Sequence, residues 1–504
     1  MIEEAQRETV AFLSDPNTHG GAQVETITTH ASIVFLAGDR VLKLKRAVKY
    51  SYLDFSTVDL RRKFCEAELA LNRRTAPQLY RAVQSVTREP DGRLALDGKG
   101  EAVDWVVVMQ RFPQEALFSR LAEADCLKPD LMRRLADRIA AFHRDAYGMP
   151  DFGGVKGVAQ VIAINDENLR RDGPPRISEA EAAALTVAAR VAASALSDLL
   201  EQRRVAGKVR CCHGDLHLNN ICLIDGEPTL FDGIEFNPSL ACIDVLYDLA
   251  FLLMDLRFRG HATEAAIVFN RYLDVTDESD GLATLPLFLA LRAWVRAHVT
   301  ATAAKSGAGD IEVARRYFDL ALDLLKPHPP RLVAIGGLSG TGKSTIAAIL
   351  SGGIGHAPAA RVLRSDVIRK RQFGASPEQR LPPEAYSAES TRRVYATLEA
   401  QAQSVVAAGC SVIIDAVAAK PEERTEFSAF AQRIGVPFNG IWLEAPPEAL
   451  RQRVGGRKND ASDADLAILE KQLRYDLGVI DWHRIDASGT PDVVADAAMR
   501  AITR

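Results

Sequence analysis

Cysteine is scarce in this sequence, and the few cysteines follow no metal-binding pattern. Seven cysteines in 504 residues are an odd number, and a chain of this length can stabilise its cores without disulfide staples. We therefore expect reduced thiols. The crowded set Cys211, Cys212, Cys222 and Cys242 contains no paired C-x-x-C, so it predicts small buried side chains rather than a metal site.

Long apolar runs are also missing. No stretch reaches the roughly 18 apolar residues of a membrane helix, and even "VLYDLAFLLMDL" is interrupted by Asp248 and Asp255. The first ten residues are acidic and lack the basic region and apolar core of a secretory signal. We expect a cytoplasmic protein that has no membrane partner.

The sequence has no strong excess of charge of either sign. The formal net charge is -4 and the pI is near 6.3, which provides no global field to hold a polyanion. The chain is 47% hydrophobic and 25% charged, as ordinary globular proteins are. Its length favours about three compact units, and no repeat or low-complexity tract stands out.

Proline marks the clearest domain boundary. Pro327, Pro329 and Pro330 end a helical pattern and precede the apolar strand from Leu332 to Ile335. We therefore predict three segments: a β-rich lobe with one helix at 1–112, a helical lobe with a strand-loop-strand island at 113–327, and an α/β domain with a parallel sheet at 328–504.

The stretch "GGLSGTGKST" predicts a phosphate-binding loop. Gly337, Gly342, Lys343 and Ser344 fit G-x-x-x-x-G-K-[ST] between an apolar strand and a helical stretch. Glycines let backbone N–H groups converge on phosphate, Lys343 reaches the β and γ phosphates, and Ser344 can ligate Mg²⁺. Gly340 and Thr345 complete the predicted nucleotide cradle.

Three further features of this segment predict phosphoryl transfer. Asp366, at a strand end in "LRSDVIRK", can accept the proton of an attacking hydroxyl, and Arg369 one turn later can hold the acceptor. Asp415 ends "SVIID" and can hold the Mg²⁺ shell or the acceptor. An arginine-rich stretch predicts a mobile lid over the transferring phosphate: Arg451, Arg453 and Arg457.

Plainer interpretations stay open for these residues. The two aspartates could cap the segments that follow their strands, and the arginines could form a solvated helix face. On "GLSGTGKST", "SDVIRK" and the arginine-rich stretch, residues 331–504 resemble the P-loop small-molecule kinases, a group that includes gluconate kinases, zeta toxin-like kinases and polynucleotide 5′-kinases.

The stretch "CCHGDLHLNN" predicts a second phosphotransferase site. Phosphoryl transfer needs a group that orients a hydroxyl and ligands that hold Mg²⁺. Asp215 can orient or deprotonate the acceptor, and Asn220 can ligate the metal. A second metal carboxylate is expected after a short hairpin, where Asp232 follows "TLF".

Such a site also needs a cation and a carboxylate to orient it. "RVLKLK" presents Lys43 and Lys45 on one face of a strand, and "FCEAELALNRR" offers Glu66 and Glu68. We prefer Lys43 with Glu68. Lys45 and Glu66 remain alternatives, because the pattern does not fix which side faces the cleft.

Residues 24–326 resemble the aminoglycoside phosphotransferase family, a branch of the protein-kinase-like fold. The resemblance rests on "HGDLHLNN", "LFDGIEF", "VLKLK" and "VVVMQRF", the last as the connector that contacts adenine. It implies a bilobal α+β domain in which Asp215 is the catalytic base, Asn220 and Asp232 are Mg²⁺ ligands, and His213 is a structural member of the loop.

Two departures from that family are visible. The glycine-rich nucleotide loop is replaced by "THASIVFL", whose polar residues must cover the phosphates: Thr28, Thr29, His30 and Ser32. "ALRAWVRAHV" places Arg292 and Arg296 on one helix face. If that face lines the acceptor cleft, we expect a neutral or anionic acceptor. If it faces solvent or pairs with acidic side chains, it does not indicate the charge of the acceptor.

The order of the two segments resembles bacterial fusions of an aminoglycoside phosphotransferase-like domain with a C-terminal kinase. We expect a bifunctional kinase that uses ATP and Mg²⁺ on small-molecule hydroxyl acceptors. A nucleotide-sensing regulatory protein is one alternative. A nucleic-acid 5′-end kinase, suggested by "RKR" at Arg369 to Arg371, is another, but the nearly balanced charge after 331 disfavours it. The sequence identifies neither acceptor and does not fix the oligomeric state.

Overall fold

The computed structural model describes residues 6–29, 31–50, 53–173, 177–276, 278–305, 309–376, 379–456, 463 and 465–503. The chain divides into two compact units, Met1–Val161 with Ser197–Asp255, and Ile162–Leu196 with Leu256–Arg504. The second unit therefore holds the last helices of the segment predicted as the helical lobe together with residues 328–504. The domain limits at 112 and 328 stay predictions.

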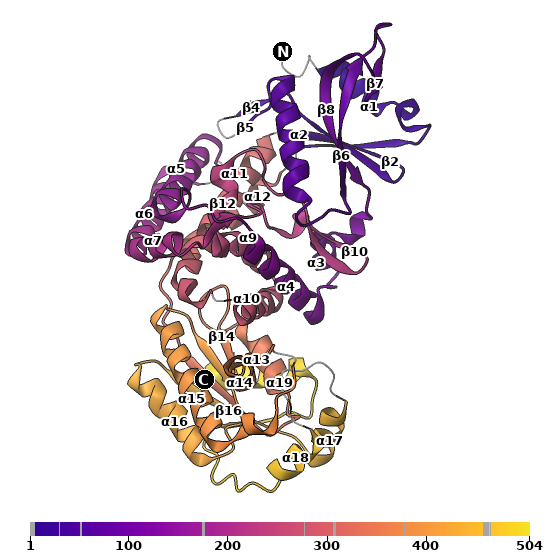
Figure 1. The fold of residues 1–504 in the computed structure, drawn as a ribbon. Helices are drawn as coiled ribbons and strands as arrows, with labels where there is room; N and C mark the ends of the chain where they lie inside the picture. Colours follow the sequence, from indigo (N-terminus) through magenta and orange to yellow (C-terminus); the bar gives the residue numbers. More distant parts are fainter. Residues whose placement is uncertain are drawn as a thin grey trace. The chain divides into compact units, whose positions relative to one another are not determined.

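Six antiparallel strands form the sheet of the first unit, in the order β1-β2-β3-β8-β6-β7 (Figure 1). The strands are β1 (Val24–Thr28), β2 (Ser32–Ala37), β3 (Arg40–Lys45), β6 (Tyr80–Arg88), β7 (Leu94–Leu96) and β8 (Glu101–Gln110). Helices α1 (Arg7–Ser14) and α2 (Val58–Asn72) complete this part. The Thr57 hydroxyl caps α2 by accepting a hydrogen bond from the backbone N–H of Leu60.

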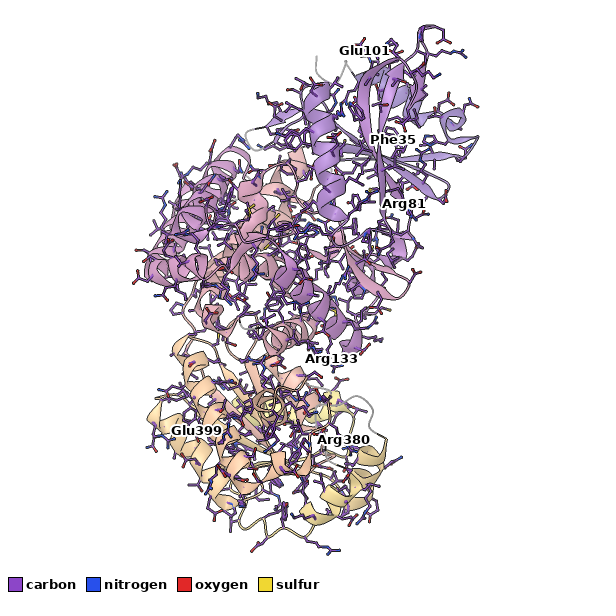
Figure 2. The ribbon with its side chains drawn as sticks, in the orientation of Figure 1. Phe35, Arg81, Glu101, Arg133, Arg380 and Glu399 are labelled. Carbon is purple, nitrogen blue, oxygen red and sulfur yellow. The ribbon has the colours of Figure 1, made fainter. Side chains whose placement is uncertain are left out.

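Buried side chains cover both faces of the central strands of this sheet. One face packs with α1 through Leu13, Phe35, Leu42 and Leu44 (Figure 2 labels Phe35). Val41 packs on the opposite face with Cys65 of α2. Successive side chains of a strand alternate between faces, so Lys43 and Lys45 lie on the α2 face.

The remainder of the first unit is mainly helical and carries three short strand pairs, β4-β5, β10-β11 and β9-β12. Its elements are η2 (Pro16–His19), β4 (Lys49–Tyr50), β5 (Leu53–Asp54), η3 (Gln114–Ala116), α3 (Phe118–Glu123), α4 (Pro129–Asp145), α7 (Ser197–Val205), β9 (Val209–Cys211), η4 (Leu218–Asn220), β10 (Ile221–Ile224), β11 (Glu227–Leu230), α8 (Pro238–Ala241) and β12 (Cys242–Asp244). Two helices begin in this unit and end in the second, α5 (Gly154–Asp172) and α9 (Val245–Phe258). The "HGDLH" loop lies between β9 and η4. Every residue of α9 from Val245 to Leu256 is buried, so an acid on this helix needs a partner.

The second unit begins with helices and ends with a parallel sheet. The helices before the sheet are α6 (Glu179–Ala195), α10 (Ala262–Val275), η5 (Ser279–Thr284), α11 (Leu285–Lys305) and α12 (Ile311–Leu324). By length and composition, Ser279–Lys305 could span a bilayer, but 72% of its apolar window is buried. The bent pair of α6 and α7 passes the same test if it is taken as one span.

Five parallel strands form the sheet of the second unit, in the order β14-β15-β13-β16-β17. The strands are β13 (Leu332–Gly336), β14 (Arg361–Arg364), β15 (Val412–Asp415), β16 (Phe438–Glu444) and β17 (His483–Asp486). The helices are α13 (Lys343–Ser351), α14 (Ser365–Gln372), η6 (Pro383–Tyr386), α15 (Ala388–Ala407), α16 (Pro421–Arg433), α17 (Pro447–Gly455), α18 (Leu466–Gln472) and α19 (Pro491–Thr503). Short apolar strands alternate with helices, as βαβ units require.

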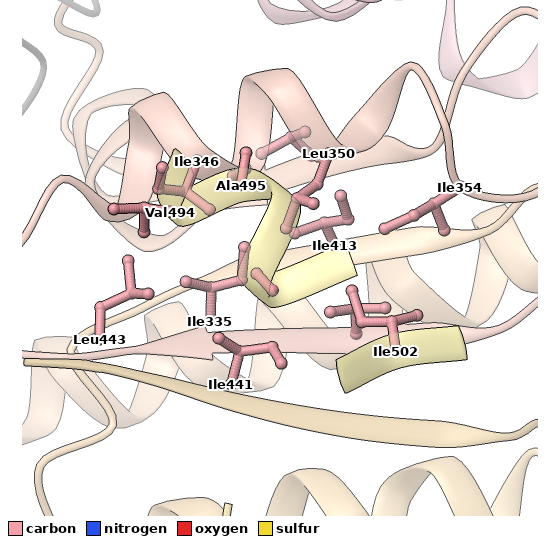
Figure 3. Close-up of a cluster of buried hydrophobic side chains, with 14 of the residues drawn as sticks. Ile335, Ile346, Leu350, Ile354, Ile413, Ile441, Leu443, Val494, Ala495 and Ile502 are labelled. Carbon is pink, nitrogen blue, oxygen red and sulfur yellow. The ribbon is translucent and has the colours of Figure 1, made fainter. Parts of the chain in front are cut away.

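A single apolar core fixes the position of the loop that follows β13. Ile346 and Leu350 of α13 point toward the sheet residues Ile335, Ile413 and Ile441 (Figure 3). Helix α19 adds Val494, Ala495 and Ile502 to the same core (Figure 3). The start of α13 is therefore held rigidly at the carboxyl end of the central strand.

Helix α10 covers the edge strand β14 within the second unit. Val362 N donates to Asn270 Oδ1 at 2.7 Å, which satisfies a backbone group that an open sheet edge would leave unpaired. Arg361 Nη2 lies 2.6 Å from Asp274 Oδ1, and its side chain is 4% exposed. The edge of the sheet is thus closed by a polar contact with a helix that precedes residue 328.

Candidate active sites

The loop between β9 and η4 brings Asp215 and Asn220 together. Asn220 Nδ2 donates to Asp215 Oδ2 at 2.8 Å and to Asp215 O at 2.9 Å. His217 Nε2 lies 3.2 Å from the same Asp215 oxygen. The loop passes through Gly214 at φ +83°, where a Cβ would lie 2.9 Å from Leu240 O, so only glycine fits this turn.

His213 connects this loop to the segment that carries Asp232. Its Nε2 lies 2.8 Å from Phe231 O, and its Nδ1 accepts from Asp215 N at 3.3 Å. Since Nδ1 accepts and a carbonyl oxygen can only accept, the ring proton lies on Nε2, and burial lowers the pKa of His213. Phe231 N donates to Asn220 O at 3.0 Å, so the segment around Asp232 is fixed to the loop from both sides.

Two aspartates of α9 that interrupt its apolar sequence support this loop. Asp248 accepts from His213 N at 3.1 Å and from Gly214 N at 2.8 Å. Asp255, seven residues along the same helix face, accepts from Leu218 N at 3.0 Å. Both carboxylates are buried, at 0% and 3% exposure, and charge-assisted bonds of this kind hold backbone firmly.

A buried group beside Asp248 has the composition of a metal site. The ligand atoms of His143, Cys212 and Asp248 lie within 4.8 Å of one another. His143 Nε2 is 3.0 Å from Asp248 Oδ2, and that carboxylate also accepts the two loop N–H groups. The geometry is that of a hydrogen-bonded support for the loop.

The structure brings Lys43 to Glu68, the partner preferred from the sequence, and also to Asp232. Lys43 Nζ lies 2.9 Å from Glu68 Oε1 and also contacts Asp232 Oδ1. Glu68 is 0% exposed, whereas the Asp232 side chain is 42% exposed. Asp232 has φ +61°, and its N–H donates to Tyr80 Oη at 3.1 Å.

The alternative lysine belongs to the same charge cluster. Lys45 Nζ lies 2.7 Å from Glu68 Oε2 and also contacts Glu235. Burial alone would raise the pKa of Glu68, but the two lysines outweigh it and hold that pKa at about 2. Burial raises the pKa of Glu235 despite the neighbouring lysine. Sequence reasoning missed Glu235, and Glu66 lies on the exposed side of α2 with Arg62 at 2.9 Å.

This cluster fits a nucleotide with a metal ion. It contains three carboxylates, Glu68, Asp232 and Glu235, against the two lysines. The carboxylate in excess is the exposed Asp232, and Mg²⁺ is commonly bound through one or two carboxylates and phosphate oxygens. Asn220 uses its amide nitrogen Nδ2 to hold Asp215. Its predicted metal-ligating atom, Oδ1, is the other atom of the same amide group.

The β1–β2 turn is built without glycine. Thr29 Oγ1 accepts from Ser32 N at 3.0 Å and donates to Ser32 O at 3.1 Å, and Arg46 Nη1 donates to Thr29 O at 2.8 Å. Thr28 ends β1, and His30 lies outside the described residues. Side-chain hydrogen bonds stabilise this turn, which contains no glycine.

In the second unit, glycines 337 and 340 are required by close contacts of the phosphate-binding loop. Gly337 has φ +143° and Gly340 has φ +89°. A Cβ would lie 2.5 Å from Leu443 O at Gly337 and 2.9 Å from Leu450 O at Gly340. Gly342 has φ +87° and caps α13, and Gln472 Oε1 accepts from Ser339 N at 2.8 Å. The loop is therefore held against α17 and α18.

Ser344 and Asp415 form an oxygen pair below this loop. Ser344 Oγ donates to Asp415 Oδ2 at 2.6 Å, and Arg364 Nη2 donates to Ser344 Oγ at 3.0 Å. A hydroxyl beside a carboxylate is a donor set that suits Mg²⁺. Lys343 Nζ bonds the carbonyls of Gly337 at 2.8 Å and Leu338 at 3.2 Å, and Thr345 is exposed on the first turn of α13.

Asp366 and Arg369 both lie on α14 but have different surroundings. Asp366 is partly buried in the first turn. Arg369 is 7% exposed, and its Nη1 donates to Ala385 O at 2.7 Å while the guanidinium lies 4.9 Å from the Tyr386 ring centroid. The structure places this arginine against η6.

The predicted lid arginines have protein partners or lie outside the described residues. Arg451 Nε lies 2.6 Å from Glu470 Oε1. Arg453 Nη2 donates to Ser488 O at 3.5 Å. Arg457 lies outside the described residues. Sequence reasoning missed Asp463, which accepts from the Tyr386 hydroxyl at 2.6 Å and lies 3.1 Å from Lys370 Nζ.

The structure thus brings together two separate sets of predicted site residues, one around Asp215 and one around Lys343. Two family models match the chain accordingly. Residues 61–285 match the phosphotransferase enzyme family, and residues 332–476 match an AAA domain. The resemblance and the fold class predicted from the sequence are confirmed: a kinase-like α+β domain precedes a C-terminal domain with a parallel sheet. Two kinase-family domains indicate phosphotransfer activity.

Curated relatives share almost the whole length of the chain. Uncharacterized proteins of Mycobacterium tuberculosis (strain ATCC 25618 / H37Rv) and Mycobacterium bovis (strain ATCC BAA-935 / AF2122/97) are each 28% identical over 482 residues. The matched region covers 92% of this chain and 93% of each relative. The match therefore extends over both segments of this chain that the family models cover.

Solved structures resemble part of the chain. A choline/ethanolamine kinase family protein from Mesorhizobium loti is 15% identical, covering 64% of this chain and 99% of that protein, with a TM-score of 0.40. A sugar kinase from Janibacter sp. HTCC2649 is 22% identical, covering 35% and 95%, with a TM-score of 0.27. An APS kinase from Mycobacterium tuberculosis is 19% identical, covering 36% and 100%, with a TM-score of 0.27.

Proposed function

We propose that this protein is a bifunctional cytoplasmic kinase with one active site in each kinase-family domain. When bound, Mg·ATP supplies a γ-phosphoryl group to each site, and the acceptor is the hydroxyl group of a small molecule. The observation that supports this most is the pair of complete residue sets. Each combines a cation for phosphate, oxygen ligands for a metal and a carboxylate at the end of a strand or in a loop.

In the first site, the work of the chain is to position groups. Asp215 takes the hydroxyl proton of the acceptor on its carboxylate, which the Asn220 amide holds in place at 2.8 Å. Asn220 and Asp232 supply oxygen ligands for Mg²⁺. Lys43, oriented by Glu68 at 2.9 Å, neutralises phosphate charge. Kinase catalysis consists largely of such positioning and charge stabilisation.

In the second site, the loop 337–342 and the start of α13 bind phosphate through backbone N–H groups and Lys343. Ser344 and Asp415 hold the metal, and Arg364 at 3.0 Å from Ser344 Oγ steadies that pair. Asp366 serves as the proton acceptor. In this proposal Arg453 and Arg457 close over the phosphate, and Arg369 holds the acceptor side of the site through η6.

The basic cluster of α14 supports a small-molecule acceptor over a nucleic-acid end. Arg369 donates to Ala385 O, Lys370 pairs with Asp463, and Arg371 donates to the carbonyls of Leu273 and Asp274. Cations engaged in this way do not form a solvated surface for a polyanion. The guanidinium of Arg296 is also engaged within the protein, because it lies 5.7 Å from the Tyr317 ring centroid.

The β1–β2 turn favours a second candidate function, a nucleotide sensor. A turn closed by Thr29 side-chain bonds differs from the flexible glycine loop that covers phosphate in active kinases. In this version the first site binds ATP without turnover and biases the second site.

Site-specific variants of the full-length protein test the proposal. ATP would be supplied with pools of small-molecule alcohols, and products would be followed by ADP release and by mass gain of one phosphate. We expect Asp215→Ala to abolish one set of phosphorylated products and Lys343→Ala to abolish another. Asp225→Ala and Lys326→Ala, both on exposed positions, serve as matched controls.

The outcomes separate the two candidates. If neither single variant changes ADP release with any acceptor pool, the kinase proposal fails. In the second outcome, Lys343→Ala removes all ATP turnover, although the unaltered first site of this variant still binds ATP in calorimetry. The first site is then a nucleotide sensor, and the protein is not a bifunctional kinase.

A further inference from the structure

Two cysteines face each other immediately before the "HGDLH" loop. Cys211 ends β9, Cys242 begins β12, and the two are direct antiparallel partners. The neighbouring bonds Cys212 N to Ala241 O at 2.8 Å and Val245 N to Lys208 O at 3.0 Å mark hydrogen-bonded pairs. Since such pairs alternate along an antiparallel ladder, Cys211 and Cys242 form a non-hydrogen-bonded pair.

That register suits a covalent bridge. The Cα atoms of a non-hydrogen-bonded antiparallel pair are about 4.5 Å apart, within the range of about 4.4–6.8 Å that disulfides span. Both thiols are free. A bond between the two sulfur atoms would therefore form without a shift of either strand.

The surroundings of Cys211 make it the reactive member. Arg74 Nη1 lies 3.5 Å from Cys211 Sγ, and Arg74 Nη2 donates to Cys211 O at 3.0 Å. The Cys242 thiol donates to Cys211, and this bond, with Arg74 acting against burial, lowers the pKa of Cys211 to about 6. The same bond raises the pKa of Cys242. Cys211 is partly exposed and Cys242 is 4% exposed.

Three buried thiols elsewhere in the chain have a raised pKa, in contrast to Cys211. Burial raises the pKa of Cys65, Cys222 and Cys410 to about 12. A thiolate, rather than a thiol, is the nucleophile in sulfur oxidation. An oxidant that reaches this part of the chain therefore meets one sulfur that is ready to react and one partner within reach.

We propose that Cys211 and Cys242 are a reversible oxidation site, which a peroxide converts into a cross-strand disulfide. The Cys211 thiolate attacks one peroxide oxygen and forms a sulfenic acid, and the other oxygen leaves as hydroxide. The Cys242 sulfur then attacks the sulfenic sulfur, and the hydroxyl leaves as water with the proton of Cys242. The two sulfurs lose two electrons and the peroxide gains them.

The position of the bridge relates it to the phosphotransferase loop. Cys211 precedes Asp215 by four residues, and Arg74 follows the end of α2. Oxidation removes the anionic sulfur that Arg74 contacts and covalently joins the start of the loop to β12. The modification itself does not depend on the proposed kinase function, because its detection requires no substrate.

Peptide mapping of the full-length protein tests the proposal. The reduced protein would be treated with hydrogen peroxide, blocked with N-ethylmaleimide and digested without reductant for mass spectrometry. We expect a peptide pair joined through Cys211 and Cys242, which dithiothreitol separates. Cys242→Ser should leave Cys211 as a sulfenic acid that dimedone traps, and Cys126→Ser, at an exposed cysteine, should leave the bridge unchanged.

Two results would overturn the inference. In the first, Cys211 and Cys242 both stay alkylatable at a peroxide dose that oxidises the exposed Cys126. In the second, Cys211 forms its disulfide with Cys212 instead. Both results are read from wild-type protein, so the conclusion does not depend on the folding of any variant.

Discussion

Lys45 Nζ lies 2.7 Å from Glu68 Oε2, in an ion pair whose side chains are 2% and 0% exposed. Lys45 also contacts Glu235, which is 6% exposed. Lys45→Met removes the cation that both carboxylates face, and breaking a buried pair costs about 3–5 kcal/mol. Hydrogen exchange of the β3 and α2 amides would measure the loss without assuming that both units unfold together.

Lys49→Met provides the control for this change, since the Lys49 side chain is 67% exposed and its loss should cost no more than about 0.5 kcal/mol. The double variant Lys45→Met with Glu235→Gln should regain part of the stability. Equal protection in Lys45→Met and Lys49→Met would contradict the importance of the buried cluster.

Asp248 should control the rate at the first site through the loop backbone. The two Asp248 oxygens accept one hydrogen bond each from His213 N and Gly214 N. An asparagine at this position has only one acceptor oxygen, so its NH2 group must face one of these two backbone N–H groups. A displacement of about 1 Å in a catalytic loop costs about 100-fold in rate. We expect Asp248→Asn to lower kcat by about that factor and to leave the KM for ATP nearly unchanged, while Asp225→Asn changes neither. An unaltered kcat would mean that the loop holds its shape without this carboxylate.

Metal dependence should distinguish Asp415 from other strand-end acids. Asp415→Asn weakens the oxygen pair with Ser344, and loss of a supporting metal contact typically costs about 10–100-fold in metal affinity. Titration of Mg²⁺ against nucleotide binding at the second site should show that shift, and chelation by EDTA should abolish turnover at both sites. Asp486→Asn, at the exposed end of β17, should show no shift. Equal Mg²⁺ curves for the two variants would rule out Asp415 as part of the metal site.

Gly340→Ala should disrupt the phosphate-binding loop by a steric clash. Gly435 has φ +72° with no atom within 4 Å of a Cβ, whereas a Cβ at Gly340 meets Leu450 O at 2.9 Å. Both alanine variants therefore carry the strain of positive φ, about 1–2 kcal/mol, but only Gly340→Ala adds a clash. We expect its ATP affinity at the second site to fall at least about 10-fold, or about 1.4 kcal/mol, as measured by calorimetry. Comparable affinities in the two variants would contradict the contact with α17.

The alkylation rate of Cys211 should rise at a lower pH than is usual for cysteine. The Cys242 hydrogen bond and Arg74 hold the pKa of Cys211 at about 6, although burial and Asp248 oppose them. The iodoacetamide rate at this residue should therefore rise through about pH 6 and level off near pH 7. In Cys242→Ala, which removes the thiol donor, the midpoint should move upward, and Cys126→Ser should leave it in place. A midpoint near pH 8.5 in the wild-type protein, the ordinary value for cysteine, would contradict this contact.

The sequence predicts the residues that lie close together along the chain. The loop with Asp215 and Asn220 and the phosphate-binding loop are short motifs, and their spacing alone indicates their chemistry. The choice between Lys43 and Lys45 could not be made, because a period of two residues places both on one strand face. The structure shows why the pattern is ambiguous: Glu68 contacts both lysines.

Contacts between distant segments could not be predicted in this way. Asp248 and Asp255 interrupt an apolar helix, and a buried acid needs a partner, but the sequence does not name the loop that supplies it. Arg364 reaches Ser344 and Asp415 because β14 and β15 pair in register, which depends on sheet topology. The roles of the predicted site residues stay predictions until the variants above are measured.

The contact between α10 and β14 decides where this chain can be divided. A fragment that starts at the proline cluster would expose the guanidinium of Arg361 and the edge N–H of Val362 after removing Asp274 and Asn270. Such a fragment would present an open strand to its own copies and tend to aggregate. Expression of the C-terminal domain alone should therefore start upstream of Ala262, so that α10 is kept with the sheet edge that it covers.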